Sequence, residues 1–232
     1  MTRPRLALLN AAMESVHTPR NFRRELDADL AEFDVTDEQL PATFDFDGFV
    51  VTGSKSAVYE DDPWIEATEA WAEEAVDRGL PALGVCWGHQ LLAQALGGTV
   101  EDMGEFELGF REVQKVGDSR LLDGIGDPMY PFISHGDAVT ELPPGAEPIA
   151  ENDYSNHGFA LDRVHTVQFH PEYDAETARH VAEGKEFLDD EYRRRVLDSI
   201  TDENYDRSTA VKTLFENFTS YVREVETPAA AD

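Results

Sequence analysis

A single cysteine between a strand-like run and a helix-like run constrains the fold of this 232-residue chain more than any other feature. Cys86 lies in the heptapeptide Gly-Val-Cys-Trp-Gly-His-Gln at 84–90. The apolar run 81–85 before it favours a buried strand, and the run 91–96 after it favours a helix. A tight junction needs small residues where backbones approach closely, and glycines flank the cysteine on both sides. The segment predicts a strained strand-turn-helix elbow with Cys86 at its tip.

Two interpretations of Cys86 follow from this position. A thiol near a helix N-terminus lies in the positive end of the backbone dipole, which favours the reactive thiolate. A lone cysteine is also commonly a small buried core residue. One cysteine excludes an intramolecular disulfide, so we expect a reduced, cytoplasmic protein.

The order of strand and helix patterns points to an α/β sheet. Apolar strands are predicted at 5–10 and 47–52, and helices begin at Thr18-Pro19 and at Asp62-Pro63. Leu30 continues the helical spacing of the first of these helices. Continuous apolar strands alternating with helices are typical of a parallel sheet covered on both faces.

The predicted secondary structure changes twice along the rest of the chain. From about 99 to 170 the sequence predicts short strands and turns, and an apolar stripe at 211–222 predicts a final helix. We therefore expect a three-layer α/β sandwich with a mostly parallel central sheet and a small antiparallel β portion. We expect one domain over 1–225, a charged helical insertion near 178–207, and a disordered tail at 226–232.

The balance of acidic and basic residues limits the classes of partner that the protein can bind. The chain has 48 Asp and Glu against 19 Lys and Arg, a net charge of -29, and the acids are dispersed. Such a coat is typical of a halophilic protein, because concentrated salt screens the repulsion between carboxylates. An ordinary acidic protein is the alternative. We expect no nucleic-acid partner, because no basic patch is present to neutralise phosphates, and no membrane partner, because no apolar run approaches ~20 residues.

A second motif lies at the end of another predicted strand, in Gln168-Phe169-His170-Pro171-Glu172. Residues i and i+2 of an extended segment point to the same side, and Pro171 favours an extended His170. Glu172 can then hold the imidazole in one tautomer and leave the other ring nitrogen for a thiol. The alternative is a strand-end histidine beside a surface acid.

The two motifs together, with His170 84 residues after Cys86 (170 minus 86), resemble the class I glutamine amidotransferase family. The segment 51–54 stands where that family places its oxyanion loop. The resemblance runs from about residue 5 to 173, and it is closest to stand-alone proteins similar to the glutamine amidotransferase domain of GMP synthase. It implies a flavodoxin-like fold.

The resemblance also implies roles for individual residues. Cys86 is the nucleophile, His170 is the base and proton donor, and Glu172 orients His170. The backbone N–H groups of Gly53 and Trp87 form the oxyanion hole, and the substrate is held by Gln90, Ser134 and His135. The sequence has no phosphate loop, no dinucleotide fingerprint and no metal-ligand spacing, so we expect no cofactor and no metal.

Three functions remain open from the sequence. The first is a glutaminase that passes ammonia to an acceptor on a partner synthetase. The second is a stand-alone γ-glutamyl hydrolase or peptidase that acts on a γ-glutamyl compound with the same triad. The third is a non-enzymatic regulatory scaffold. The insertion near 178–207 could dock the partner, cap the active site, or pair two copies into a homodimer.

Overall fold

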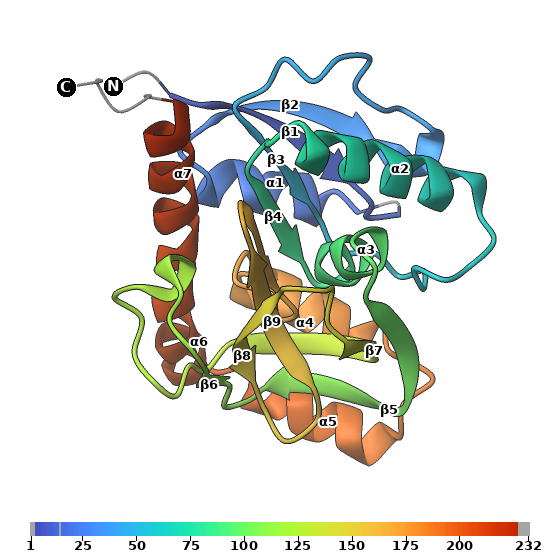
Figure 1. The fold of residues 1–232 in the computed structure, drawn as a ribbon. Helices are drawn as coiled ribbons and strands as arrows, with labels where there is room; N and C mark the ends of the chain where they lie inside the picture. Colours follow the sequence, from blue (N-terminus) through green and yellow to red (C-terminus); the bar gives the residue numbers. More distant parts are fainter. Residues whose placement is uncertain (1–2, 14, 227–232) are drawn as a thin grey trace.

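The computed structural model describes residues 3–13 and 15–226. Of the tail predicted at 226–232, residues 227–232 lie outside the described residues. An eight-stranded sheet has the order β2-β1-β3-β4-β10-β9-β8-β6, and β5 and β7 form a second, two-stranded sheet (Figure 1). The strands are β1 (Arg5–Asn10), β2 (Asp29–Asp34), β3 (Gly48–Val51), β4 (Ala82–Val85), β5 (Thr99–Phe110), β6 (Gln114–Lys115), β7 (Phe132–Glu141), β8 (Glu147–Glu151), β9 (Asn156–Leu161) and β10 (Val164–Val167).

The direction of the strands divides the large sheet into two parts. Strands β2, β1, β3, β4 and β10 are parallel to one another. Strands β9, β8 and β6 continue the sheet in antiparallel pairs, and the β5–β7 pair is antiparallel as well. The expected mostly parallel sheet with an added antiparallel portion is confirmed. The parallel part brings the carboxyl ends of β3, β4 and β10 to one edge.

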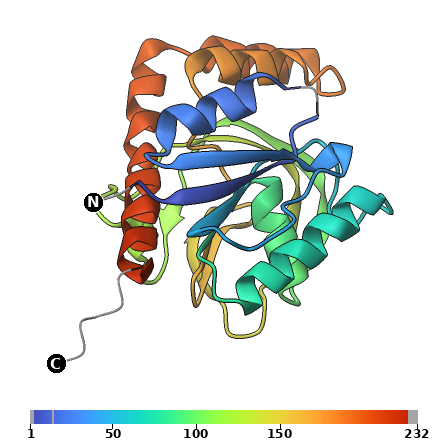
Figure 2. The ribbon, with the colours of Figure 1, turned by 90° about the horizontal axis from the view of Figure 1, so that it is seen from above.

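Helices cover both faces of the parallel strands, as the view from above shows (Figure 2). Alternate residues of β1 serve the two layers: Leu6 and Leu8 pack in the core below α1 and α7, whereas Ala7 and Leu9 pack in the core below α2 and α3. Both faces are buried, which explains the uninterrupted apolar strands. The helices are α1 (His17–Glu25), α2 (Pro63–Asp77), α3 (Trp87–Ala95), α4 (Ala175–Glu183), α5 (Asp190–Ser199), α6 (Asp202–Ser208) and α7 (Thr213–Glu226), with 3-10 turns η1 (Val35–Asp37), η2 (Arg120–Leu122) and η3 (Thr209–Lys212).

Two predictions about helices are wrong. Leu30 lies on the edge strand β2, because α1 ends at Glu25 and Leu26 is already extended. An edge strand pairs on one side only and is half-buried, so its pattern is easily mistaken for a helix face. The segment 185–188, predicted as helical, is a turn between α4 and α5.

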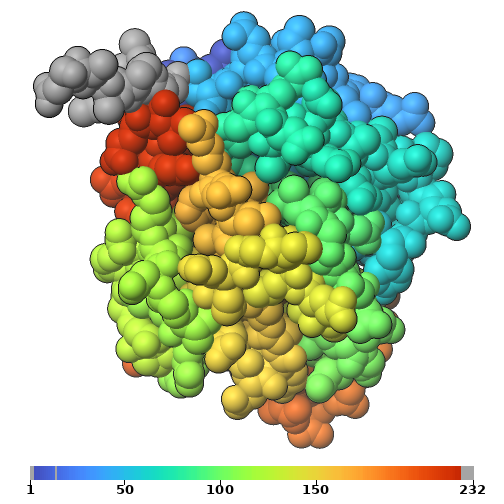
Figure 3. Space-filling view, in the orientation of Figure 1, coloured from blue at the N-terminus to red at the C-terminus, as the bar shows by residue number. Residues whose placement is uncertain are grey.

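The segment 178–207 contains most of α4, all of α5 and most of α6, and α4 and α5 pack against the β5–β7 pair. Tyr192 of α5 accepts a hydrogen bond from the N–H of Leu108 (3.0 Å) and donates one to its carbonyl (3.1 Å). Val196 is buried beside Gly109 of β5. In the space-filling view α5 emerges at the lower margin of the molecule, beyond β5 (Figure 3). No helix among the described residues is both long and apolar enough to span a bilayer.

Candidate active site

Cys86 occupies a strained junction between β4 and α3. Its φ is 55° and its ψ is -108°, a conformation that costs a residue with a side chain on the order of 1–3 kcal/mol. A Cβ on Gly84 would lie 2.5 Å from the carbonyl oxygen of Gly88, and a Cβ on Gly88 would lie 2.3 Å from that of Val51. Only glycine at both positions lets the strands and the helix approach this closely. The predicted strained elbow is confirmed.

The side chain of Cys86 is buried but keeps a small solvent-exposed fraction. Cys86 is 5% exposed, and its Sγ lies 3.9 Å from the carbonyl oxygen of Ser134. The Cys86 N–H donates to the carbonyl of Val167 (2.8 Å), which fixes the end of β4 against the end of β10. This adjacency brings the residues that follow β10 to the thiol.

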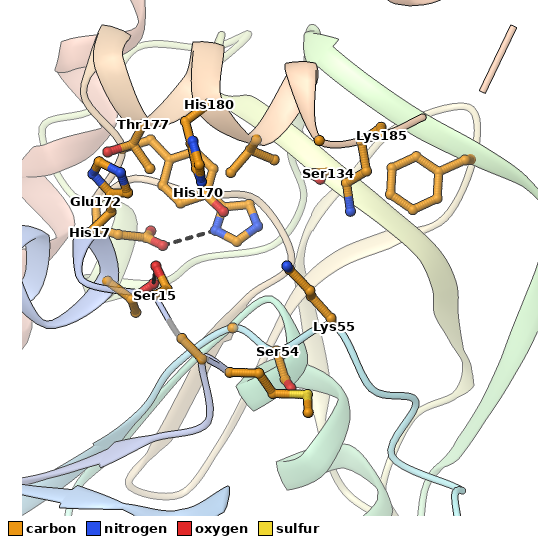
Figure 4. Close-up of a pocket in the computed structure, with 18 of the residues that line it drawn as sticks. Ser15, His17, Ser54, Lys55, Ser134, His170, Glu172, Thr177, His180 and Lys185 are labelled. Carbon is orange, nitrogen blue, oxygen red and sulfur yellow. Dashed lines mark hydrogen bonds and ion pairs between the residues drawn. The ribbon is translucent and has the colours of Figure 1, made fainter. Parts of the chain in front are cut away.

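His170 and Glu172 form a buried pair beside Cys86. The Glu172 carboxylate accepts a hydrogen bond from Nδ1 of His170 at 2.9 Å (Figure 4). The His170 N–H donates to the carbonyl of Phe132 (2.9 Å), so β7 holds the backbone of this turn. The prediction that His170 and Glu172 face the same space is confirmed.

The charges around His170 favour its protonated form. Burial alone would lower the pKa of His170, but Cys86 and the carboxylate of Glu172 outweigh burial and raise it to about 10. An imidazolium at neutral pH stabilises a thiolate beside it, which is the reactive form of a cysteine.

Tyr173 is a site residue that the sequence reasoning missed. Its ring stacks on the imidazole of His170, with the centroids 4.1 Å apart and an interplanar angle of 15°. Burial raises the pKa of Tyr173 well above its ordinary value, so its hydroxyl stays neutral. The stacking fixes the plane of His170, while Glu172 fixes its rotation. In the sequence, the only indication of this role is that an aromatic residue directly follows the His-Pro-Glu motif.

The predicted oxyanion donors lie against the thiol and the imidazole. A Cβ on Gly53 would lie 3.1 Å from Cε1 of His170 and 3.6 Å from Cβ of Cys86. Trp87 is the first residue of α3, where N–H groups have no acceptor inside the helix. Within residues 3–13 and 15–226, neither the Gly53 N–H nor the Trp87 N–H donates a backbone hydrogen bond.

The predicted substrate-binding residues divide into two kinds. Ser134 lines the cavity beside His170. Gln90 is buried and donates to the carbonyl of Asp137 and to Oε1 of Gln168, each at 2.9 Å. His135 is also buried, and its Nδ1 lies 2.9 Å from the carbonyl of Asp137. The side chains of Gln90 and His135 therefore hold the backbone of 134–137, and they do not line the cavity.

A buried cluster behind this segment was not foreseen from the sequence. Glu107 is fully buried and accepts from Nε2 of His135 (3.0 Å) and from Nδ2 of Asn152 (2.7 Å), and Nε2 of His157 lies 3.3 Å from the same carboxylate. Burial would raise the pKa of Glu107, but the two histidines lower it to about 2. Glu107, His135 and His157 are also a donor set that could hold a metal ion. Their wide separation along the chain explains why no ligand spacing was visible.

A cavity of about 420 Å³ adjoins the His170–Glu172 pair. Gly53, Ser134 and His170 line it on the side of Cys86. The other lining residues include α4, the turn after α4 and the segment 12–18 that leads into α1 (Figure 4). Pockets of this size hold small organic ligands. The polar side chains around its rim include Ser15, His17, Lys55, Thr177, His180 and Lys185.

Known proteins resemble the chain in sequence and in fold. A family model described as "Glutamine amidotransferase class-I" matches residues 15–190. GMP synthases (glutamine-hydrolyzing) from Aromatoleum aromaticum and Methylobacillus flagellatus are each 34% identical to it over 171 residues, or 69% of this chain. The match covers 31% and 30% of those relatives, so the chain spans about a third of their length.

Solved structures give the same fold. A glutamine amidotransferase from Thermotoga maritima has a TM-score of 0.79 at 24% identity, covering 94% of this chain and 99% of that one. A glutamine amidotransferase from Methylobacillus flagellatus has a TM-score of 0.77 at 22% identity, covering 99% and 98%. The family model covers most of the chain, including Cys86, His170 and Glu172. The chain therefore belongs to the class I glutamine amidotransferase family.

Proposed function

We propose that this protein hydrolyses the side-chain amide of glutamine with Cys86, His170 and Glu172, and passes the ammonia to an acceptor on a partner protein. The observation that carries the proposal is the thiol of Cys86, whose backbone is strained, beside the imidazole of His170. Cys86 and Glu172 keep that imidazole protonated. Family membership supports the choice of glutamine as substrate.

The first half of the reaction forms a thioester. The Cys86 thiolate attacks the amide carbon, and its electron pair forms the C–S bond while the carbonyl becomes an oxyanion. The N–H groups of Gly53 and Trp87 stabilise that oxyanion, at about 3–4 kcal/mol per donor. The C–N bond then breaks, and His170 gives its proton to the nitrogen, which leaves as ammonia.

The second half releases glutamate. Neutral His170 takes a proton from water, and the oxygen attacks the thioester carbon through the same oxyanion site. The C–S bond breaks, glutamate leaves, and the proton remains on the imidazole beside the thiolate. Glu172 and Tyr173 keep the ring in place through both halves, because one fixes its rotation and the other its plane.

The identity of the acceptor is a further part of the proposal. The relatives named GMP synthase are about three times as long as the matched segment, and this chain corresponds to only one part of them. We propose that the ammonia acceptor is bound by a separate synthetase, with the turn and helices at 184–208 as a docking or capping element.

A second candidate is a γ-glutamyl hydrolase that works without a partner. The cavity of about 420 Å³ beside His170 lies within the size range of pockets that hold drug-sized ligands. It could hold an amine portion attached to the same γ-amide nitrogen, with identical chemistry at Cys86.

The test measures glutamate and ammonia release in concentrated salt, with glutamine and a γ-glutamyl dipeptide as parallel substrates and Cys86→Ala as the control. Glutamine turnover that is lost in Cys86→Ala supports the amidotransferase. Dipeptide turnover well above glutamine turnover supports the γ-glutamyl hydrolase instead. Release of neither product, with or without a synthetase recovered by affinity purification, contradicts both and favours a regulatory scaffold.

A further inference from the structure

Two of the four lysines of this chain line the cavity beside His170: Lys55 and Lys185, here called the lysine pair. The other two lysines have protein partners elsewhere. Lys115 donates to the carbonyl of Ile125 (2.7 Å), and Lys212 forms an ion pair with Glu25 (2.5 Å). The lysine pair therefore differs from the other two lysines in its location and because, among the described residues, neither ammonium group donates a hydrogen bond to a protein oxygen.

Neither member of the pair has an anionic partner in the part of the chain that the structure describes. Within residues 3–13 and 15–226, no carboxylate lies within ion-pair distance of either ammonium group. Lys185 packs its Nζ over the ring of Phe106, 4.5 Å from the centroid. Asp and Glu outnumber Lys and Arg 48 to 19 in this chain, so two lysines that face one cavity without a carboxylate partner among residues 3–13 and 15–226 are unusual. An unpaired cation that faces a cavity is available to an anionic ligand.

The two lysines approach the cavity from different elements. Lys55 follows Gly53 and Ser54 on the loop after β3, and Lys185 lies in the turn after α4. Their ammonium groups point into the same open space beside the imidazole of His170 (Figure 4). This convergence is what a bidentate site for a carboxylate requires.

The pKa of Lys185 agrees with the position of both lysines in one cavity beside Cys86. Burial lowers the pKa of Lys185, the charge of Cys86 opposes that effect, and the like charge of Lys55 adds to it. Lys185 therefore interacts with both Lys55 and the thiol. A bound anion would relieve the repulsion between the two ammonium groups and offset the cost of burial.

We propose that Lys55 and Lys185 form a carboxylate-binding subsite that holds a γ-glutamyl substrate over Cys86. This inference rests on the proposed function of the same site. The carboxylate has two sources: the α-carboxylate, which glutamine shares with every γ-glutamyl compound, or a carboxylate on the amine that leaves, as in a γ-glutamyl amino acid.

The first test needs no turnover. Cys86 is the only cysteine, so intact-mass measurement gives its alkylation rate directly. Iodoacetate carries a carboxylate, whereas iodoacetamide is neutral and of similar size. We expect the iodoacetate-to-iodoacetamide rate ratio to fall about tenfold in Lys55→Gln/Lys185→Gln, because charge-assisted hydrogen bonds to the carboxylate are lost. A change in the fraction of thiolate alters both rates equally and cancels in the ratio.

Two controls make this result specific. Arg194→Gln removes one positive charge from an exposed position on α5, outside the cavity, and should leave the ratio unchanged. Lys55→Arg/Lys185→Arg keeps both charges and should retain the preference for iodoacetate. An unchanged ratio in the double Gln variant, or an equal fall in Arg194→Gln, overturns the subsite. A circular dichroism spectrum and a thermal unfolding midpoint equal to those of the wild type show that the double Gln variant is still folded.

The second test identifies the carboxylate, using glutamine, γ-glutamylmethylamide and γ-glutamylglycine. An equal rise of KM for all three in the double Gln variant assigns the pair to the α-carboxylate. A rise for γ-glutamylglycine alone assigns it to the leaving amine. Unchanged KM values for all three overturn the assignment to substrate. A wild-type protein that turns over none of them contradicts the proposed function, but the alkylation ratio still decides whether the subsite exists.

Discussion

The imidazole of His170 is held by two different interactions at the scale of the single residue. Glu172 accepts a hydrogen bond from Nδ1, and Tyr173 stacks on the ring face. The hydrogen bond joins His170 to a charged carboxylate, whereas the stacked ring of Tyr173 is neutral. The two contributions can therefore be separated by changing one side chain at a time.

Glu172→Gln should preserve the shape of the site and remove its charge. Without the carboxylate the pKa of His170 falls from about 10, so less imidazolium is present at neutral pH to stabilise the thiolate. We expect kcat to fall about 10²- to 10⁴-fold and iodoacetamide to alkylate Cys86 more slowly at neutral pH. Glu186→Gln makes the same change of charge at an exposed position and serves as the control. A wild-type kcat in Glu172→Gln would contradict this role.

Glu107→Gln should alter the acid sensitivity of the fold. The pKa of Glu107 is lowered from an ordinary value of 4.5 to about 2, so its ionised form stabilises the folded state above pH 4.5. That contribution, on the order of 1–3 kcal/mol, is lost as the pH falls from 4.5 toward 2. Urea unfolding at a series of pH values should show a smaller decrease for Glu107→Gln than for the wild type. Exposed Glu105→Gln should behave as the wild type, and parallel curves for Glu107→Gln would refute the argument.

Residue-level prediction from sequence succeeded where the relationship is local. The strained Cys86 and the His170–Glu172 pair follow from neighbours two residues apart and from glycines beside the thiol. Glu107 and Lys185 were not foreseen, because each reaches its surroundings only when segments far apart in the sequence fold together.

Glycine governs the packing of the elbow at the scale of secondary-structure elements. Gly88→Ala would place a Cβ 2.3 Å from the carbonyl oxygen of Val51, so α3 must move away from β3. We expect a loss of about 1–3 kcal/mol in the free energy of unfolding and slower alkylation of Cys86. Gly126→Ala is the matched control, because its Cβ would meet nothing within 4 Å. Equal stability of the two variants would show that the elbow tolerates the displacement.

The elements were predicted best where a strand is buried on both faces. β1, β3 and β4 give continuous apolar runs that helices do not imitate at such short length. β2 was missed because it is a half-buried edge strand whose exposure pattern lacks strict alternation. The turn at 185–188 was taken for a helix because its residues have helical propensity, but Lys185 and Phe187 instead face the cavity.

The net charge of -29 acts on the whole molecule. The Debye length shortens from about 10 Å at 0.1 M salt to about 3 Å at 1 M, so concentrated KCl should reduce the repulsion among dispersed carboxylates. A gain of about 2 kcal/mol raises the midpoint of thermal unfolding by roughly 4–8 °C for a domain of this size. Thermal scans across KCl concentrations, with sucrose as an uncharged comparison, test the halophilic prediction. A midpoint that is highest in dilute buffer would contradict it.

Labelling with a diazoketone analogue of glutamine, which alkylates the thiol that attacks the amide carbon, tests most directly whether Cys86 is the nucleophile. We expect one label per chain on the peptide that contains Cys86, slower labelling in the presence of glutamine, and loss of glutamate release in proportion to the label. Labelling that glutamine does not slow, or glutamate release that persists after Cys86 is fully labelled, would contradict the assignment of Cys86 as the nucleophile.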